Sequence, residues 1–332
     1  MADREPLRLG TRGSQLALWQ ARAVAARIAE SGGPPCDIVV IRTTGDRVQD
    51  AALSEVGGKR LFVKELEDAL LRREIDLAVH SSKDMPAALP DRLKIAAVLP
   101  REDPLDAIVL PDGSAPSTLT LEELVSSLGQ SPAIGTGSVR RVAQLARLMP
   151  GGRFVPIRGN LDTRLRKLDE GEYDALVLAA AGLRRLGFGR RISLALPATA
   201  CVPAPGQGIV AVEVLDGDRD RDKEVQRVLE RIDDREAATA LIAERALVTA
   251  LGGGCQTPIG ALASQVDAET LELTAAVIAL DGSRALRAHA QAPARDAALL
   301  GAQVGAQLLA DGAGEILEGA RHAHGAVQDI QP

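Results

Sequence analysis

Two stretches of the chain follow the same order of strand, turn and helix, and this internal likeness constrains the fold more than any other feature. The first, LGTRGSQLALWQARAVAARI, begins at Leu9, and the second, IGTGSVRRVAQLARLM, begins at Ile134. In each, a short apolar run ends in a glycine-containing turn, and a helical pattern follows. In the first stretch, Ser14 is suited to be the helix N-cap. This alternation predicts two similar α/β lobes, each with a largely parallel sheet.

Apolar runs and helical periodicity extend this prediction along both lobes. The proline- and serine-rich residues 111–117 indicate a linker, and the polar residues 43–60 are long enough to be a functional loop. The charged residues 216–224 are expected to form a surface turn, and the strand at 209–214 is expected to return to the first lobe. Strands are expected at 7–11, 37–42, 77–80, 95–99, 107–110, 133–136, 154–158, 173–179 and 209–214, and helices at 15–30, 61–73, 139–148 and 161–169.

The last third of the chain has a different pattern. A long helix at 233–251 leads into glycines and an apolar strand, and Asp281-Gly282 is a hairpin turn between strands at 270–280 and 285–290. The expected fold class is α/β, with two similar periplasmic-binding-protein-like lobes that have mixed, mostly parallel sheets, and a smaller C-terminal α+β domain. The expected final helices are 294–309 and 313–320, and the expected domains are 1–108 with a return segment at 206–225, 109–205, and 226–332.

Composition narrows the functional classes. A net charge of −6 argues against non-specific binding to nucleic acid or acidic membranes, and 2% aromatic residues argue against base-stacking platforms. The three cysteines are too widely spaced for a metal site or a disulfide framework. Residues 1–8 lack the apolar stretch of a signal peptide, and no run approaches the length of a membrane span, so we expect a cytoplasmic protein without metal or membrane partner.

Six arginines lie at or just after predicted strand ends. In parallel α/β sheets ligands bind beyond the carboxyl ends of the strands, where helix N-termini favour anions and arginine adds bidentate recognition of carboxylates. Any one of these arginines alone is more simply a solvated surface residue, but together they predict a ligand with several separated negative charges. No P-loop or dinucleotide fingerprint is present. The six are Arg12, Arg140, Arg141, Arg158, Arg164 and Arg185.

Two loops carry further candidate groups. Cys255 follows three glycines, which leave room for a bulky partner, although cysteines outside disulfides are more often small buried hydrophobes. Lys83 and Asp84 follow the strand at 77–80, and loops held by a rigid sheet often carry catalytic groups, although aspartate is also common in turns. His80 is expected to be a packed or a capping residue, because no second histidine is placed to form a relay or a metal site with it.

Nine sequence blocks together resemble the porphobilinogen deaminase (hydroxymethylbilane synthase) family, from about residue 7 to residue 265. They are LGTRGSQLAL, TTGD, GGKRLFVKELE, AVHSSKDMP, LPREDPLDA, IGTGSVRR, RGNLDTRLRKLDEGEYDALVLAAAGLRRL, PAPGQG and LGGGCQTPIG. The resemblance implies a monomeric, cytoplasmic transferase. Such an enzyme condenses four porphobilinogen molecules head to tail with loss of ammonia. Hydrolysis then releases the linear tetrapyrrole hydroxymethylbilane, which passes to a downstream tetrapyrrole enzyme.

The resemblance also implies roles for single residues. One dipyrromethane cofactor per chain would be attached through a thioether to Cys255, and Asp84 would be the catalytic residue. Glu55 departs from the family, many of whose members carry lysine there. The implied cofactor contacts are Ser82, Lys83, Asp84, Thr136, Ser138, Arg140, Arg141 and Arg164, and the implied substrate contacts are Arg12, Ser14, Lys59, Phe62, Arg158, Arg164 and Arg185.

Without the family resemblance, the residues are also compatible with two other functions. A solute-binding module would explain two α/β lobes and the arginines, but not a cysteine on a glycine loop in a third domain. A cysteine-nucleophile transferase would need a histidine base near Cys255, and the four histidines, His80, His289, His322 and His324, offer no obvious partner.

Overall fold

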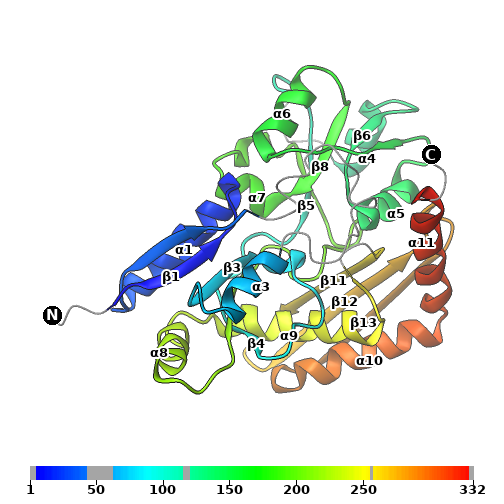
Figure 1. Cartoon of the computed structure of the whole chain (residues 1–332). Helices are drawn as coiled ribbons and strands as arrows, with labels where there is room; N and C mark the ends of the chain where they lie inside the picture. Colours follow the sequence, from blue (N-terminus) through cyan, green and yellow to red (C-terminus); the bar gives the residue numbers. More distant parts are fainter. Residues whose placement is uncertain (1–4, 43–62, 115–119, 255–256, 329–332) are drawn as a thin grey trace. The chain divides into compact units, whose positions relative to one another are not determined.

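The structure is a computed structural model, and it describes residues 5–42, 63–114, 120–254 and 257–328 (Figure 1). The chain divides into two compact units. Unit 1 comprises Met1–Glu102 and Ile209–Thr239, and unit 2 comprises Asp103–Gly208 and Ala240–Pro332.

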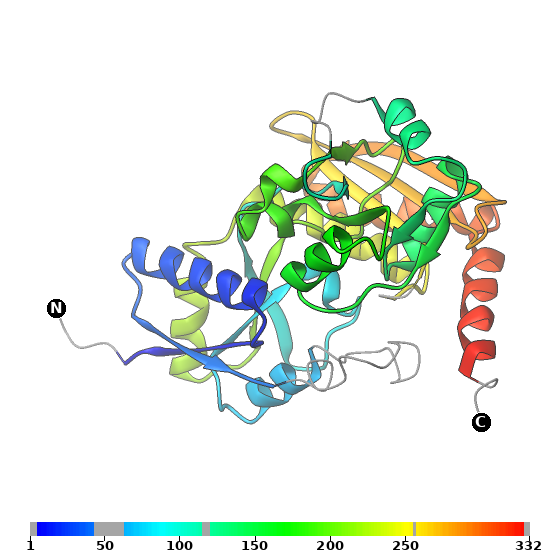
Figure 2. The same cartoon turned by 90° about the horizontal axis from the view of Figure 1, so that it is seen from above.

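Unit 1 is built on a five-stranded sheet in the order β2-β1-β3-β10-β4. Only β10 runs against its neighbours, so four of the five strands share one direction. Helix α1 packs along this sheet through Ala21, Val24 and Ile28 (Figure 2). The strands are β1 (Leu7–Thr11), β2 (Cys36–Val40), β3 (Leu77–Ser81), β4 (Leu93–Val98) and β10 (Val210–Leu215), and the helices are α1 (Gln15–Glu30), α3 (Lys64–Leu71) and α8 (Asp220–Leu229).

Unit 2 contains a second five-stranded sheet with the same topology, in the order β7-β6-β8-β5-β9. Here β5 is the one reversed strand. The shared strand order and direction confirm the expected pair of similar lobes with mixed, mostly parallel sheets. The strands are β5 (Asp106–Val109), β6 (Ala133–Gly135), β7 (Arg153–Val155), β8 (Ala175–Ala179) and β9 (Leu194–Leu196), and the helices are α4 (Leu121–Ser127), α5 (Val139–Leu148), α6 (Leu161–Asp169) and α7 (Ala180–Arg185).

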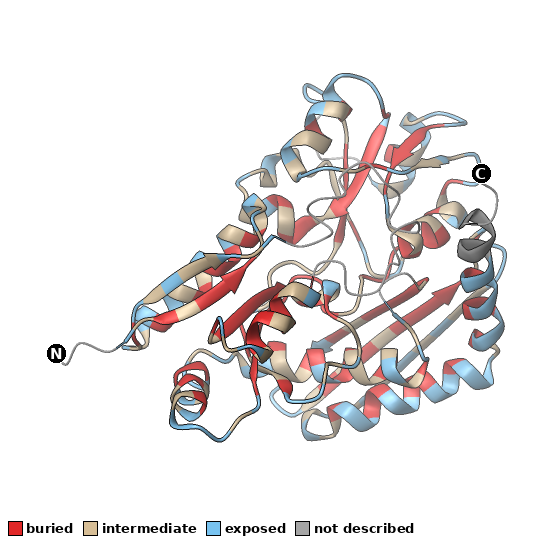
Figure 3. Cartoon of the chain, viewed as in Figure 1, coloured by how far each residue is buried: buried red, intermediate tan, exposed pale blue. Residues whose placement is uncertain are grey.

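The C-terminal part of unit 2 is the expected smaller α+β region. Its antiparallel sheet follows the order β11-β12-β13, and α10 buries one side against it while its other side is exposed (Figure 3). Small residues allow close helix packing, since Gly301 of α10 lies directly against the Ala243 carbonyl of α9. Helix α9 (Arg235–Ala250) begins in unit 1 and belongs to unit 2 from Ala240 onward. The other elements are β11 (Ile259–Gln265), β12 (Thr270–Ile278), β13 (Ala285–Pro293), α10 (Ala297–Ala310) and α11 (Ala313–Gln328).

One expectation about local structure is corrected. The charged segment 216–224 is not a simple turn, because α8 begins at Asp220. Asp220 and Asp222 in its first turn suit the helix dipole, and Val225, Val228 and Leu229 form its buried face. The expected domain boundary at residue 108 falls inside β5, which pairs with β8 and β9. The three-domain division remains a prediction.

Within the described residues, no helix combines the length and apolar character needed to cross a membrane.

Candidate functional site

The turns after β1 and β3 lie at the same edge of the unit 1 sheet. These strands are parallel neighbours, paired through Leu9 and Leu77, so their carboxyl ends meet where ligands bind in such sheets. The Ser14 side chain caps α1 by accepting a hydrogen bond of 3.3 Å from the Ala17 amide, as expected from the sequence. The first turn of α1 carries no acidic residue, so its N-terminus keeps its preference for an anion. Arg12 lies half-buried in the same turn.

A short 3₁₀ turn, Ser82–Asp84, follows β3 and presents the expected catalytic carboxylate. The Ser82 amide donates to the Ile209 carbonyl at 3.0 Å, and the Met85 amide donates to the Ser82 carbonyl at 3.1 Å. Ser82 and Met85 are buried, whereas Asp84 between them is exposed and Lys83 is half-buried. The turn is thus anchored on both sides of Asp84, and Asp84 itself is exposed.

The equivalent turn of unit 2 joins β6 to α5. Thr136 is buried, and its hydroxyl accepts a hydrogen bond of 3.3 Å from the Ser138 amide. Ser138 caps α5 by accepting from the Arg141 amide at 3.4 Å, and the first turn of α5 again lacks an acidic residue. The two lobes therefore repeat the same capped, anion-favouring helix start, and α5 adds Arg140 and Arg141 to it.

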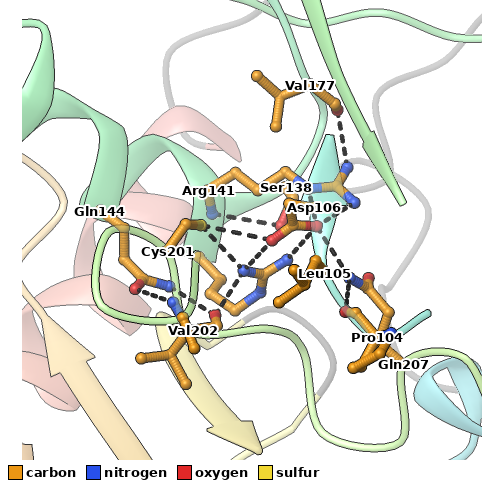
Figure 4. A network of polar contacts seen from close by, with 12 residues as sticks. Pro104, Leu105, Asp106, Ser138, Arg141, Gln144, Val177, Cys201, Val202 and Gln207 are labelled. Carbon is orange, nitrogen blue, oxygen red and sulfur yellow. Dashed lines mark hydrogen bonds and ion pairs between the residues drawn. The ribbon is translucent and has the colours of Figure 1, made fainter. Parts of the chain in front are cut away.

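A buried ion-pair network lies beneath this turn and centres on Asp106, the first residue of β5 (Figure 4). Its carboxylate accepts from Arg140 through Nη1 at 2.6 Å and Nη2 at 3.1 Å. It also accepts from Arg141 Nε at 2.9 Å and from Gln207 Nε2 at 2.9 Å. All four side chains are buried. The network fixes both arginines and joins α5, β5 and the segment around Gln207.

The electrostatics of this network are those of an ionised carboxylate between two cations. Burial alone would raise the pKa of Asp106, but Arg140 and Arg141 outweigh that effect and hold the pKa well below its usual range. Cys201 lies 3.4 Å from both Arg140 Nη1 and the Asp106 carboxylate. Burial raises the pKa of the Cys201 thiol to about 12, although Arg140 opposes this, so the thiol is neutral at physiological pH.

The remaining expected arginines of unit 2 are distributed around the same sheet edge. Arg158 is half-buried beyond the end of β7. Arg164 Nε donates to the Gly159 carbonyl at 2.8 Å, and Arg185 Nη2 donates to the Gly208 carbonyl at 2.6 Å. Lys59, Phe62 and Cys255 lie outside the described residues.

Sequence reasoning missed Asp106 and Gln207 as site residues. Asp106 stands at the start of an apolar strand in LPREDPLDA, and Gln207 lies in PAPGQG, so both belong to recognisable blocks. Their link to Arg140 and Arg141 is a tertiary contact that no local pattern reports. Among the described residues, no group of three or more His, Cys, Asp or Glu side chains could hold a metal ion.

Comparison with known proteins places the chain in a family. The model described as "Porphobilinogen deaminase, dipyromethane cofactor binding domain" matches residues 7–223, and the model of the porphobilinogen deaminase C-terminal domain matches residues 238–310. The chain belongs to the porphobilinogen deaminase family. The porphobilinogen deaminase of Syntrophobacter fumaroxidans is 45% identical over 319 residues, covering 96% of this chain and 98% of the relative. That of Pelotomaculum thermopropionicum is 47% identical over 315 residues, covering 94% and 96%.

Several solved structures with more distant similarity are solute-binding proteins. The second substrate-binding domain of Lactococcus lactis GlnP is 12% identical with a TM-score of 0.41, covering 69% of this chain and 90% of that domain. An ancestral cationic amino acid solute-binding protein is 15% identical with a TM-score of 0.39, covering 68% and 89%. These TM-scores are too low to transfer a ligand or a function to this porphobilinogen deaminase family member.

Proposed function

We propose that the protein is a hydroxymethylbilane synthase, which condenses four porphobilinogen molecules head to tail with release of ammonia and hydrolyses the product free as hydroxymethylbilane. Its membership of the porphobilinogen deaminase family over both family domains is the observation that carries this proposal. The enzyme is a transferase of tetrapyrrole biosynthesis. We further propose that it acts as a cytoplasmic monomer and passes its product to a downstream tetrapyrrole enzyme.

Asp84 is proposed as the catalytic residue. Loss of ammonia from porphobilinogen leaves a cationic azafulvene, which needs an anion close by. The exposed carboxylate of Asp84 on its anchored turn is suited to accept pyrrole N–H hydrogen bonds and to stabilise the developing positive charge. One preorganised group of this kind is worth about 10²–10³ in rate. The same carboxylate can also move a proton, directly or through water.

A dipyrromethane group carries acetate and propionate side chains, and the residues of unit 2 fit such a group. Two guanidinium groups share the single carboxylate of Asp106 next to a helix start that has no acidic residue. The group would supply the pyrrole end to which substrate is joined. The residues proposed to hold it are Cys255 through a thioether, with Ser82, Lys83, Asp84, Thr136, Ser138, Arg140, Arg141 and Arg164.

The growing chain gains two carboxylates with each pyrrole unit, so its binding residues must be cationic or hydrogen-bonding. Arginine is suited to this task because its planar fork binds carboxylates bidentately. Arg164 and Arg185 are each partly held by a backbone carbonyl, which limits their conformational freedom before binding. The residues proposed to contact substrate are Arg12, Ser14, Lys59, Phe62, Arg158, Arg164 and Arg185.

Mass spectrometry of the purified protein tests this function. The intact mass should exceed the sequence mass by two pyrrole units, the excess should map to Cys255, and the sample should turn pink with an acidic aldehyde reagent for pyrroles. A Cys255→Ser variant, purified in the same way, should lack the excess mass. An active parent protein with a bare thiol at Cys255 would rule out the covalent cofactor, while a solute-binding protein would show neither adduct nor turnover.

A further inference from the structure

The two arginines beneath the β6–α5 turn carry more charge than their protein contacts compensate. Arg140 and Arg141 are only 4% and 7% exposed, and among the described residues the only carboxylate paired with either of them is that of Asp106. Cys201, the other acidic group in contact with Arg140, is a neutral thiol at physiological pH. One formal positive charge therefore remains in a buried setting, where an uncompensated charge is costly.

The hydrogen bonds of the network divide the two arginines into different roles. Arg140 directs both terminal nitrogens inward, because Nη1 contacts Asp106 and the Val202 carbonyl at 2.7 Å, and Nη2 contacts Asp106. Arg141 is held on one side by Asp106, which lies 2.9 Å from Nε and 2.8 Å from Nη2, and on the other by the Val177 carbonyl, which accepts from Nη1 at 2.9 Å. Its guanidinium plane is thus fixed by two partners that lie on different strands, β5 and β8.

We infer that Asp106 is a positioning residue: its carboxylate engages Arg140 internally, orients the guanidinium of Arg141, and leaves the pair with one positive charge for a carboxylate of the dipyrromethane. This inference rests on the proposed function. The capped start of α5, which has no acidic residue in its first turn, adds a second favourable field for the same anion. Asp106 itself touches neither cofactor nor substrate in this scheme, and acts only through the arginines.

Replacing Asp106 by asparagine keeps the shape but removes the charge that holds both guanidinium groups. For Asp106→Asn we expect the fraction of purified protein with the two-pyrrole adduct to fall about tenfold. This is the effect expected when one charge-assisted hydrogen bond to the dipyrromethane is lost because its arginine is no longer oriented. In the fraction that carries the adduct, the KM for porphobilinogen should rise more than kcat falls. Adduct fraction is read from intact mass, and folding is read from circular dichroism and the Tm.

The matched control is Asp222→Asn in unit 1. Asp222 is also buried and bound by both terminal nitrogens of one arginine, Arg73, at 2.6 and 3.1 Å. This control should lower the Tm but retain the full adduct. If Asp106→Asn loses stability like Asp222→Asn and yet carries the parental adduct fraction with a parental KM, Asp106 is only structural and the inference is wrong.

A second variant covers the case in which Asp106→Asn does not fold. Asp106→Glu keeps the charge but moves the carboxylate by one methylene group, so it should fold, carry less adduct and show a raised KM. Parental adduct and KM in Asp106→Glu would contradict the positioning role. An absent adduct in the parent protein would instead overturn the proposed function, so the two failures are distinguishable.

Discussion

His80 of β3 and Glu213 of β10 meet in the interior of unit 1, with Nε2 and Oε2 3.1 Å apart. The two strands are antiparallel, and His80 lies opposite Ala211 while Glu213 lies opposite Ala78, so both side chains share one face of the sheet. Their exposed fractions are 3% and 0%. The two atoms are close enough for an ion pair, but their orientation does not allow a hydrogen bond between them. The contact ties β3 to β10 two residues before the turn that carries Asp84, and the packed position, one of the two expected for His80, is confirmed.

Replacing one residue of the His80–Glu213 pair should lower the free energy of unfolding more than replacing both. Glu213→Leu leaves a buried imidazole without its partner, and we expect the free energy of unfolding to fall by about 3 kcal/mol. The double variant His80→Leu/Glu213→Leu should recover most of that loss, because no polar group is then left alone in the core. Urea denaturation of the parent, both single variants and the double variant measures the coupling. Strictly additive losses would contradict it.

Asp84→Ala should nearly abolish turnover without changing the fold. Asp84 is exposed on its turn, where substitutions usually change stability little, and it is the carboxylate proposed to stabilise the cationic intermediate. We expect kcat to fall by at least about 10²-fold, with a Tm and circular dichroism spectrum like those of the parent. Near-normal turnover in a folded Asp84→Ala protein would refute the assigned role.

The Arg73–Asp222 ion pair should make stability depend on pH in the acid range. Hydrogen bonds from Arg73 lower the pKa of Asp222, although burial opposes them. Because the folded-state pKa lies below the unfolded value of about 3.9, the contribution is fully present above that value and is lost as the pH falls through the folded-state pKa. Arg73 is 29% exposed, so solvent screening reduces the effect.

At pH 7, about 1–2 kcal/mol of unfolding free energy should therefore separate the parent from Asp222→Asn, and the difference should shrink below about pH 4. Urea denaturation at several pH values measures it. A difference that grows as the pH falls would contradict the sign of the shift.

Two helical glycines of the C-terminal region should respond to alanine in opposite directions. Gly301 is buried, and a Cβ there would overlap the Ala243 carbonyl, so Gly301→Ala should destabilise by about 1–3 kcal/mol. Gly319 in α11 is exposed with nothing near its missing Cβ, so Gly319→Ala should stabilise by about 0.5–1 kcal/mol. Thermal unfolding of both variants measures the two changes in stability and so tests the close approach of α9 and α10. If both variants changed the Tm in the same direction and by the same amount, that close approach would be excluded.

Local patterns were sufficient to predict most elements. The apolar run and turn around β1 and α1 recur at β6 and α5, and Ser14 caps α1 as expected. Ser138, expected only as part of a turn, caps α5 in the same way. Helix α8 was missed because its charged first turn resembles a surface loop, and its buried face becomes meaningful only against the unit 1 core. The membership of β5 in the second sheet likewise depends on its pairing with β8 and β9.

The sequence by itself determined the two repeated lobes, the family and the residue types of the site, because these depend on periodicity, capping and local blocks within a few residues of each other. Only the tertiary structure decided that Arg140 and Arg141 share one buried carboxylate. Asp106 is 34 residues from Arg140 and 101 from Gln207. A charge is neutralised by whatever lies within a few ångströms in space, and the spacing of residues along the chain does not record that distance.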